Sequence, residues 1–407
     1  MTFALALYTL FGHAFFWIGL VNRLHGAALP RWFITQSTKV LLAIVAAGPF
    51  LVLAWLLAGW ENPFVAPDRS LAHRPGHVVL LAYIGVCWLA GAGTIARWLW
   101  HNAYLRRPRK VQWLHRRCRA DISPARAALR PEECVHHFTA SLPGNQSLQL
   151  DVTRREIELA WLPAALDGVT ILHLSDFHFT GKVGKAYFRE VVRVGNELQP
   201  DLIALTGDYA DGDACIDWIP DTLGRLSAPG GVYFVLGNHD TFINTRRLRE
   251  VMKASGLIDL GGRCLPLSIR GEPIILAGNE LPWIPPAPDL SVSEPGRPRP
   301  RSSSEASAPS ERLRIVLAHT PDQIGWARCH EVDLMLCGHT HGGQIRFPLV
   351  GAILMPSFHG VKFDCGLFYL PPTILHVTRG VSGKYSLRWN CPPEIALLTL
   401  HPPKKIC

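Results

Sequence analysis

Residues 232–240 read Val-Tyr-Phe-Val-Leu-Gly-Asn-His-Asp, and this order of apolar and polar residues recurs through the C-terminal part of the chain. Five apolar residues come first, and short runs rich in branched and aromatic residues are typical of buried strands. Asn238, His239 and Asp240 follow, directly after Gly237. The stretch therefore predicts a strand whose carboxyl end presents three side chains able to bind a metal or transfer a proton.

Four other apolar runs of similar length end in the same way. They are residues 169–174 before Asp176 and His178, residues 201–206 before Asp208, residues 313–318 before His319, and residues 332–337 before His339 and His341. Helical patterns at residues 186–198 and 245–254 lie between these runs, and the alternation predicts an α/β fold with parallel strands. Parallel strands end at the same edge of a sheet, where open α/β sheets bind ligands.

The polar side chains at these five strand ends are all oxygen or nitrogen donors. In Asp176-x-His178 and His339-x-His341 an extended backbone points both side chains to the same side. Carboxylate, amide and imidazole ligands together favour Mn, Fe or Zn over a structural zinc held by thiolates. Because the donors exceed the needs of one tetrahedral site, we expect two divalent metal ions that share one carboxylate.

A single one of these residues would have an ordinary structural explanation. An Asp after a strand is usually a turn or cap residue, and a buried His is usually a hydrogen-bonded core residue. Gly207, Gly237 and Gly338 each precede a candidate ligand, where we expect the chain to turn with unusual dihedral angles. Five such coincidences, each at the end of a predicted strand, favour the metal site.

The five blocks together resemble the signature of the calcineurin-like metallophosphoesterases. That signature is Asp-x-His, Gly-Asp, Gly-Asn-His-Asp or Glu, a later His, and Gly-His-x-His, and all five parts occur here in order between Asp176 and His341. The resemblance extends from about residue 148 to the C-terminus. Arg379-Gly380 and Cys391-Pro-Pro-Glu-Ile395 are similar to the membrane-anchored bacterial branch, which includes UDP-2,3-diacylglucosamine diphosphatases.

This resemblance implies a fold of two mixed β-sheets packed as a sandwich and flanked by helices. It also implies roles for the individual residues. One metal would be held by Asp176, His178, Asp208 and His341, and Asp208 would bridge to a second metal held by Asn238, His319 and His339. His239 would lie beside the substrate as a catalytic residue, and Asp240 would orient its imidazole. The implied reaction is two-metal hydrolysis of a phosphoester.

The first hundred residues predict a membrane region. Residues 3–21, 40–60 and 78–96 contain no charged side chain, and each run is close to the ~20 apolar residues that a bilayer core requires of a helix. We therefore expect residues 1–100 to form about three transmembrane helices that precede the α/β domain.

Basic residues predict the orientation. Residues 97–131 contain ten Lys and Arg against Asp121 alone, which equals the formal net charge of +9 of the whole chain. Because basic loops remain in the cytoplasm, we expect a multi-pass inner-membrane protein whose catalytic domain faces the cytoplasm. The basic stretch is either a simple flank of the last span or a contact with anionic membrane lipids. Its position next to a span argues against nucleic acid as a partner.

These observations divide the chain into a membrane region at residues 1–100, a basic juxtamembrane linker at residues 101–146 and a catalytic domain at residues 147–407. A Pro- and Ser-rich insertion at residues 285–312 is expected to be disordered. The leading function is a metal-dependent phosphohydrolase acting on a phosphoester or diphosphate bond of a lipid-linked substrate. Two alternatives remain open: a membrane-tethered phosphodiesterase or phosphatase for a soluble nucleotide or phosphoprotein, and a non-enzymatic membrane protein with a regulatory metal domain.

Overall fold

A computed structural model describes residues 2–57, 75–100, 115–118, 142–159, 162–180, 182–290 and 312–402. The chain forms two compact units, one of Met1–Arg107 with Pro356–Lys362 and one of Pro108–Met355 with Phe363–Cys407. Most of the predicted basic linker and of the predicted insertion lies outside the described residues.

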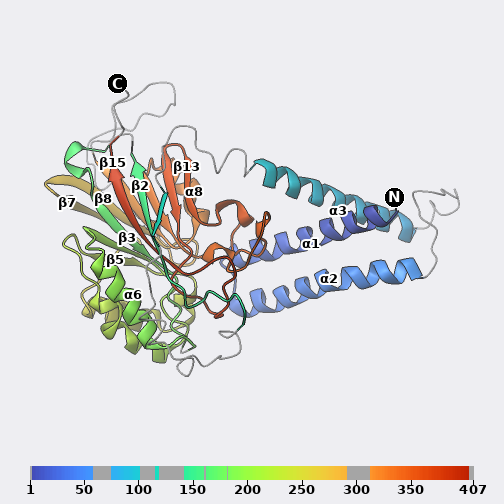
Figure 1. The fold of residues 1–407 in the computed structure, drawn as a ribbon, viewed down its shortest axis with the longest axis horizontal. Coiled ribbons are helices and arrows are strands. Elements are labelled where there is room, and N and C mark those ends of the chain that lie inside the picture. The colour runs from blue at the N-terminus through green and yellow to red at the C-terminus, as the bar shows by residue number, and fades with distance from the viewer. Residues whose placement is uncertain are drawn as a thin grey trace. The chain divides into compact units, whose positions relative to one another are not determined.

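The first unit contains three long helices, α1 (Thr2–Gly26), α2 (Arg31–Leu57) and α3 (Pro75–Trp100) (Figure 1). Segments Phe3–Gly26, Arg31–Phe50 and Val78–Trp100 are long and apolar enough to cross a membrane. The three predicted apolar helices are therefore present. The second begins nearly ten residues earlier than the uncharged run, because α2 continues through polar residues that a charge-based search excludes.

Hydrogen bonds made by side chains connect these helices to one another. The buried His13 has its Nδ1 2.5 Å from the hydroxyl of Tyr83 and its Nε2 3.0 Å from the carbonyl oxygen of Ile44. The indole N–H of Trp17 donates to the same hydroxyl at 2.8 Å. A Cβ on Gly12 would lie 1.8 Å from the carbonyl oxygen of Cys87, so α1 and α3 approach more closely than any larger residue permits. Small residues and polar contacts of this kind hold apolar helices together.

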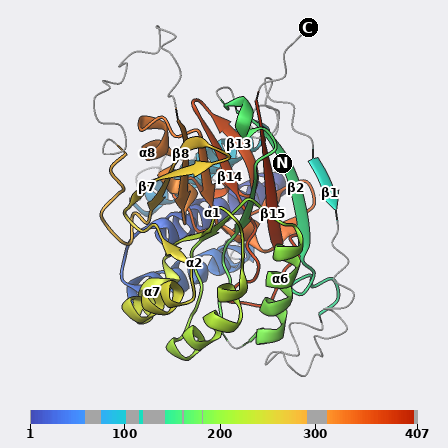
Figure 2. The same cartoon turned by 90° about the vertical axis from the view of Figure 1, so that its left-hand side faces the viewer.

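The second unit is built on two β-sheets (Figure 2). The seven-stranded sheet has the order β1 (His115–Cys118), β2 (Asp151–Glu158), β15 (Glu394–His401), β3 (Thr170–Leu174), β4 (Leu202–Thr206), β5 (Val232–Val235) and β6 (Ile258–Asp259). The six-stranded sheet has the order β13 (Gly366–Leu370), β14 (Thr373–Val377), β10 (Leu334–Cys337), β9 (Leu313–Ala318), β8 (Glu272–Asn279) and β7 (Cys264–Ile269). A separate two-stranded hairpin pairs β11 (Arg346–Phe347) with β12 (Gly351–Ala352).

Both sheets are mixed, and within each sheet the strands that carry the predicted site residues run parallel to one another. Strands β3 to β6 run parallel in one sheet and β8, β9, β10 and β14 run parallel in the other. Strand β15 is antiparallel to β3, and β7 and β13 pair antiparallel at the two edges of the second sheet. The five predicted strands are all present, but they belong to two sheets and not to one.

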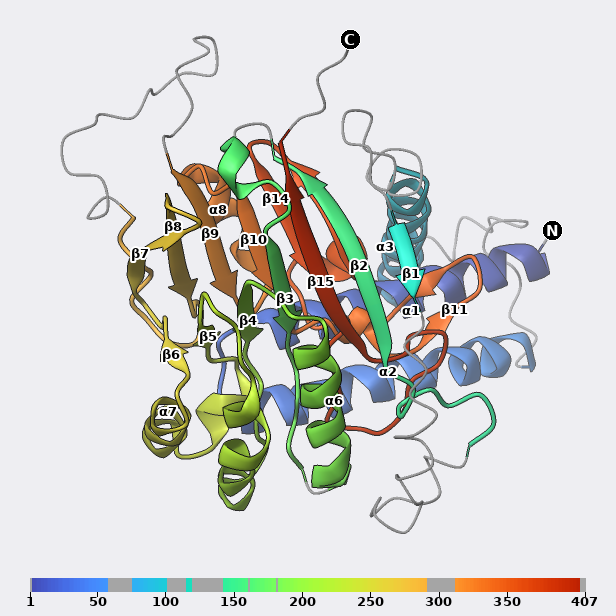
Figure 3. The same ribbon diagram turned by 60° about the vertical axis from the view of Figure 1, so that its left-hand side comes forward.

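The two sheets pack face to face, and helices cover their outer faces. Ile171 and Leu202 from one sheet meet Ile315 and Leu334 from the other in a shared core of fully buried side chains. Helices α6 (Lys185–Glu197) and α7 (Thr245–Ala254) pack on the seven-stranded sheet, and α8 (Ile324–Cys329) packs on the six-stranded sheet (Figure 3). The predicted sandwich flanked by helices is confirmed. Short 3-10 turns connect these elements, namely η3 (Ala164–Leu166), η4 (Asp213–Asp221), η5 (Leu223–Arg225), η6 (His239–Phe242), η7 (Pro321–Gln323) and η8 (His341–Gly343). A further turn, η9 (Gly360–Phe363), belongs mostly to the segment Pro356–Lys362 of the first unit.

A buried ion-pair cluster fixes the start of β15. The Glu394 carboxylate is fully buried and pairs with the guanidinium groups of Arg155 and Arg379, while the hydroxyl of Thr153 donates to it at 2.6 Å. We expect Glu394→Gln to destabilise the domain by ~3–5 kcal/mol, because it leaves buried guanidinium charge without its counterion. The denaturation midpoint of the detergent-solubilised chain measures this effect.

A matched control comes from an exposed pair on α7. Arg246 and Glu250 form an ion pair at 2.9 Å with both side chains largely in solvent. Glu250→Gln should leave the midpoint unchanged, because exposed pairs contribute little. An equal shift for both variants would contradict a stabilising role for the buried cluster.

Candidate metal centre

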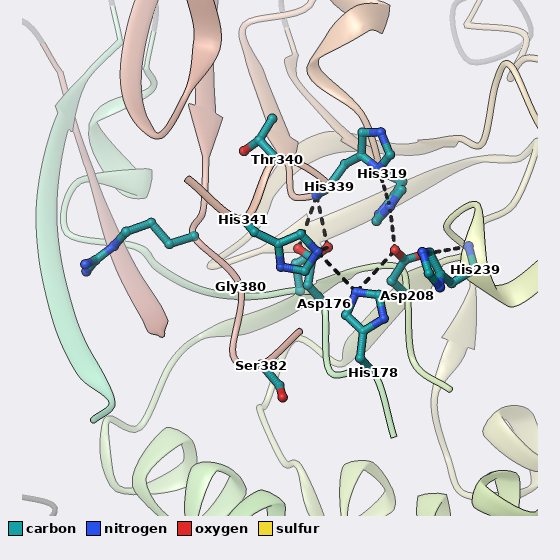
Figure 4. A network of polar contacts seen from close by, with 12 residues as sticks. Asp176, His178, Asp208, His239, His319, His339, Thr340, His341, Gly380 and Ser382 are labelled. Atoms are coloured by element: carbon teal, nitrogen blue, oxygen red, sulfur yellow. Dashed lines mark hydrogen bonds and ion pairs between the residues drawn. The ribbon is translucent and has the colours of Figure 1, made fainter. Parts of the chain in front are cut away.

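The predicted site residues lie together at the carboxyl ends of strands from both sheets (Figure 4). Asp176 and His178 follow β3, Asp208 follows β4, Asn238, His239 and Asp240 follow β5, His319 follows β9, and His339 and His341 follow β10. Because the sheets pack face to face with these ends on the same side, the site is formed between two sheets. A single strand end supplies at most three of these residues.

The backbone at the site adopts a conformation that side chains normally avoid. Asp176, His178, Asp208, His339 and His341 have φ values of 58°, 46°, 58°, 68° and 51°. Among the described residues, eleven that are not glycine have positive φ, and these five are among them. Such conformations cost of order 1–3 kcal/mol each and persist where the surrounding structure enforces them, commonly at functional sites.

Two glycines allow the chain to come close to the ligands. Gly207 has φ +93°, as the sequence predicts, and a Cβ there would lie 2.7 Å from Nδ1 of His319. For Gly338 the expectation of an unusual backbone dihedral is wrong, because its φ is not positive. The positive φ belongs to the next residue, His339. The role of Gly338 is spatial: a Cβ would lie 2.3 Å from Oδ2 of Asp176. The backbone of β10 can therefore reach the carboxylate only with glycine at this position.

One group of candidate ligands consists of Asp176, His178 and His341. One ligand atom from each lies within 4.8 Å of the others, and all three side chains are buried. The Nε2 atoms of His178 and His341 face each other at 3.2 Å, and Nε2 of His341 lies 3.5 Å from Oδ1 of Asp176. Two imidazole nitrogens turned toward one another are what a shared cation requires, so these residues fit a metal.

A second group consists of Asp208, His319 and His339, and it meets the same distance criterion. Nε2 of His319 lies 3.2 Å from Oδ2 of Asp208, 3.2 Å from Nδ1 of His339 and 3.1 Å from Oδ1 of Asn238. Oδ2 of Asp208 is also 3.5 Å from Nε2 of His178, which belongs to the first group. Asp208 therefore lies between the two groups.

The buried carboxylate and imidazole groups of the site lie so close together that they shift one another's pKa. Burial raises the pKa of Asp176. Burial acts the same way on Asp208, but the nearby imidazoles, led by His319, outweigh it and hold its pKa well below the usual range. Burial lowers the pKa of His319, yet Asp208 outweighs this and raises it to about 9. A divalent cation would supply the positive charge that the protein otherwise draws from bound protons.

His239 has a different partner from the one that the sequence predicts. Its Nδ1 contacts Oδ1 of Asp211, while the other oxygen of Asp211 lies 3.0 Å from Nδ1 of His178. The His239 side chain remains 19% exposed, so part of the ring is open to solvent. His239, His178 and Asp208 also meet the distance criterion for a third metal-ligand group.

The expectation that Asp240 orients the His239 imidazole is therefore wrong. The Asp240 carboxylate is fully buried and accepts backbone N–H groups from Asp208, Tyr209 and Gly237, each at 2.8 Å. It fixes the two loops after β4 and β5 against each other. Successive side chains of a 3-10 turn point about 120° apart, so neighbours such as His239 and Asp240 face different surroundings.

Comparison with known proteins agrees with this geometry. The family model described as calcineurin-like phosphoesterase matches residues 169–343. Phosphodiesterase YaeI of Escherichia coli (strain K12) is 34% identical over 235 residues, which cover 56% of this chain and 81% of that protein. This chain belongs to the calcineurin-like phosphoesterases.

Two further relatives extend the comparison. The uncharacterized metallophosphoesterase YkuE of Bacillus subtilis (strain 168) is 31% identical over 62% of this chain and 85% of its own length. A transmembrane protein with metallophosphoesterase domain from Bos taurus is 27% identical over 86% of this chain and 79% of its own length. The chain is thus a metal-dependent phosphoester hydrolase whose three apolar helices indicate a membrane protein.

Sequence reasoning missed two residues of this phosphoesterase. Asp211 stands three positions after Asp208, and a second carboxylate so near a candidate ligand was the available signal. Trp283 places its ring 5.1 Å from that of His339 and 5.8 Å from that of His319. No local pattern points to Trp283, because it reaches the site only through the path of the loop after β8.

Proposed function

We propose that the chain is a membrane-anchored phosphohydrolase that uses two divalent metal ions to cleave a phosphoester or diphosphate bond of a lipid-linked substrate. The metals would be Mn, Fe or Zn, held by Asp176, His178, Asp208 and His341 on one side and by Asp208, Asn238, His319 and His339 on the other. The observation that carries the proposal is that the metal-ligand groups and three membrane-length apolar helices belong to the same chain.

The metals, when bound, polarise the phosphoryl oxygens and lower the pKa of a bound water. The side chains supply the rest. Asp208 keeps the two ligand groups in contact, and its Oδ1 accepts the backbone N–H of His239 at 2.8 Å, which fixes that residue beside the ligands. Because Asp211 holds Nδ1 of His239, the Nε2 atom is the one available to donate a proton to the leaving oxygen.

Aromatic side chains at the edge of the site support a substrate with an apolar part. The Phe242 ring lies 5.6 Å from the His239 ring and is 37% exposed. Trp283 lies beside His339 and His319. A substrate with two such parts would place its charged phosphoester among the metal-ligand groups and its apolar or flat group against these rings. The basic residues at 97–131 support a cytoplasmic position of the site next to anionic lipids.

A paired-substrate assay tests the proposal. The full chain in phosphatidylcholine and phosphatidylglycerol vesicles is given a lipid-borne diphosphate and the same headgroup without acyl chains. We expect kcat/KM to be at least ~10-fold higher for the lipid-borne form, because two methylene groups buried on binding suffice for that factor. Asp208→Ala protein in identical vesicles gives the background rate.

Equal kcat/KM values for the two forms would contradict a lipid-linked substrate. Such a result would favour the alternative in which the helices only tether a phosphodiesterase or phosphatase for a soluble nucleotide or phosphoprotein. A panel with cyclic nucleotides and aryl phosphodiesters in the same vesicles distinguishes those soluble substrates.

A further inference from the structure

An exposed apolar hairpin extends from the segment that carries the metal ligand His341. Strands β11 and β12 form this hairpin directly after η8. Leu349 at its tip is 90% exposed, and the large apolar residues Phe347, Val350 and Leu354 around it are each about half exposed. Single exposed apolar residues are ordinary, but several on one short hairpin indicate an interaction surface.

Leucine at the tip is unfavourable in water for two reasons: its backbone conformation is strained, and its apolar side chain is exposed. Leu349 has φ +65°, and the N–H of Val350 donates to the carbonyl oxygen of Pro348 at 2.8 Å, so Leu349 is the centre of a three-residue turn. Turns of this kind with positive φ are rare and strained, and glycine or asparagine is the usual solution. The strained turn at the tip thus carries an exposed apolar side chain.

The exposed Trp389 lies beside the hairpin, and a second exposed aromatic residue, Tyr385, shortly precedes it in the chain. Trp389 is joined to the hairpin by backbone hydrogen bonds, from the N–H of Arg346 to its carbonyl oxygen at 2.9 Å and from its own N–H to the carbonyl oxygen of Gln344 at 3.0 Å. Tyr385 lies four residues before Trp389 and is also more than half exposed. We call Phe347, Leu349, Val350, Leu354, Tyr385 and Trp389 the hairpin surface.

Positive charge accompanies the aromatic part of this surface. The Nζ atoms of Lys182 and Lys384 lie 5.2 and 5.8 Å from the centre of the Tyr385 ring. Apolar tips, Trp and Tyr rings and Lys amines together are the composition of a surface that enters the interfacial layer of an anionic bilayer. The three membrane-length helices of the chain favour a bilayer over a protein as the partner of this surface.

A buried arginine links the hairpin surface to the candidate metal centre by a hydrogen bond. The Arg388 guanidinium donates to the carbonyl oxygen of His341 at 2.9 Å, and Arg388 directly precedes Trp389. Arg388 is also almost completely buried, so it joins the two segments rigidly. A membrane contact at the hairpin would therefore set the height of His341 above the bilayer.

We propose that the hairpin surface inserts into the headgroup layer of an anionic bilayer and holds the metal centre there. This proposal rests on the proposed membrane attachment and deepens the proposed function, because it identifies where the domain meets the lipids that carry the substrate. The bound partner is the bilayer itself, with Leu349 at acyl-chain depth and Tyr385 and Trp389 among the headgroups.

Photo-crosslinking in the full chain tests the proposal. The variant Leu349→p-benzoylphenylalanine is reconstituted in phosphatidylcholine and phosphatidylglycerol vesicles, irradiated, and analysed by mass spectrometry for adducts with acyl chains. The control is Arg246→p-benzoylphenylalanine, at an 88% exposed side chain on α7. We expect at least ~10-fold more lipid adduct at position 349, the factor that burial of one leucine side chain in the bilayer supports.

A second pair of variants removes the apolar tip without loss of fold. With the photo-reactive residue moved to position 347, Leu349→Gly should lower the lipid adduct roughly tenfold relative to the chain that retains Leu349. Its thermal midpoint should not fall, because glycine relieves the strain of φ +65°. An unchanged adduct in Leu349→Gly would overturn the proposal.

Two other results would also overturn it. Equal adduct at positions 349 and 246 would show that the tip remains in water, and a crosslink to a second copy of the chain would assign the surface to self-association. Because the readout is a lipid adduct and not turnover, failure of this proposal is distinguishable from failure of the proposed lipid substrate.

Discussion

Asp208→Ala should reduce turnover to background and release metal from both ligand groups. The carboxylate of Asp208 lies 3.2 Å from Nε2 of His319 in one group and 3.5 Å from Nε2 of His178 in the other. Its second oxygen holds the backbone N–H of His239. Removing it therefore separates the two ligand groups and takes away the carboxylate that His319 contacts.

Metal content and the hydrolysis rate of bis(p-nitrophenyl) phosphate, measured on the same full-length preparation, check this expectation. Asp217→Ala is the control, because Asp217 is an exposed residue whose carboxylate contacts only Arg247 among the described residues. It should keep both the rate and the metal. A normal rate with two metals per chain in Asp208→Ala would refute the bridging assignment, and a retained circular dichroism spectrum would show that loss of activity is not unfolding.

The sequence predicts most of the metal centre because its residues follow strands, and strand ends are set by local pattern. Asp176, Asp208 and His319 each come within two residues of a buried apolar run, so the end of the strand fixes their place. The pattern does not show that the strands divide between two sheets, because periodicity describes one strand at a time. Pairing partners such as β15, which comes from the C-terminal end of the chain, lie outside its reach.

Residues whose role depends on side-chain direction were harder to predict. Asp240 follows His239 in sequence, yet its carboxylate serves the backbone of neighbouring loops, and Asp211 serves the imidazole. His13 illustrates the same limit in the membrane region, where an uncharged run conceals a side chain that hydrogen-bonds across helices. The exposure of Leu349 is likewise a tertiary property, since its sequence context reads as ordinary apolar chain.

The role of His239 gives the second large expected effect. If His239 donates a proton to the leaving oxygen, His239→Ala should lower the rate ~10²–10⁴-fold for an alkyl phosphodiester, whose leaving oxygen needs that proton. The loss should be much smaller for a p-nitrophenyl ester, because nitrophenolate departs without one. Metal content should stay unchanged, since the other ligands in both groups remain.

The variant Asp211→Asn distinguishes proton transfer by His239 from a purely structural contribution of the pair that His239 forms with Asp211. The neutral amide in this variant would still contact the ring of His239 but would no longer place a negative charge beside it. We therefore expect the rate on the alkyl ester to fall ~10–100-fold, the usual effect of losing such an outer partner. The rate on the p-nitrophenyl ester should fall less. Because Asp211 also contacts His178, some loss of metal affinity should accompany the loss of rate.

Metal titration of both variants separates the effect on proton transfer from the effect on metal binding. Loss of metal in His239→Ala would make His239 a ligand, as the group of His178, Asp208 and His239 permits. An equal rate loss on both esters would instead remove His239 from the proton-transfer step and leave it a role in binding the phosphoryl group.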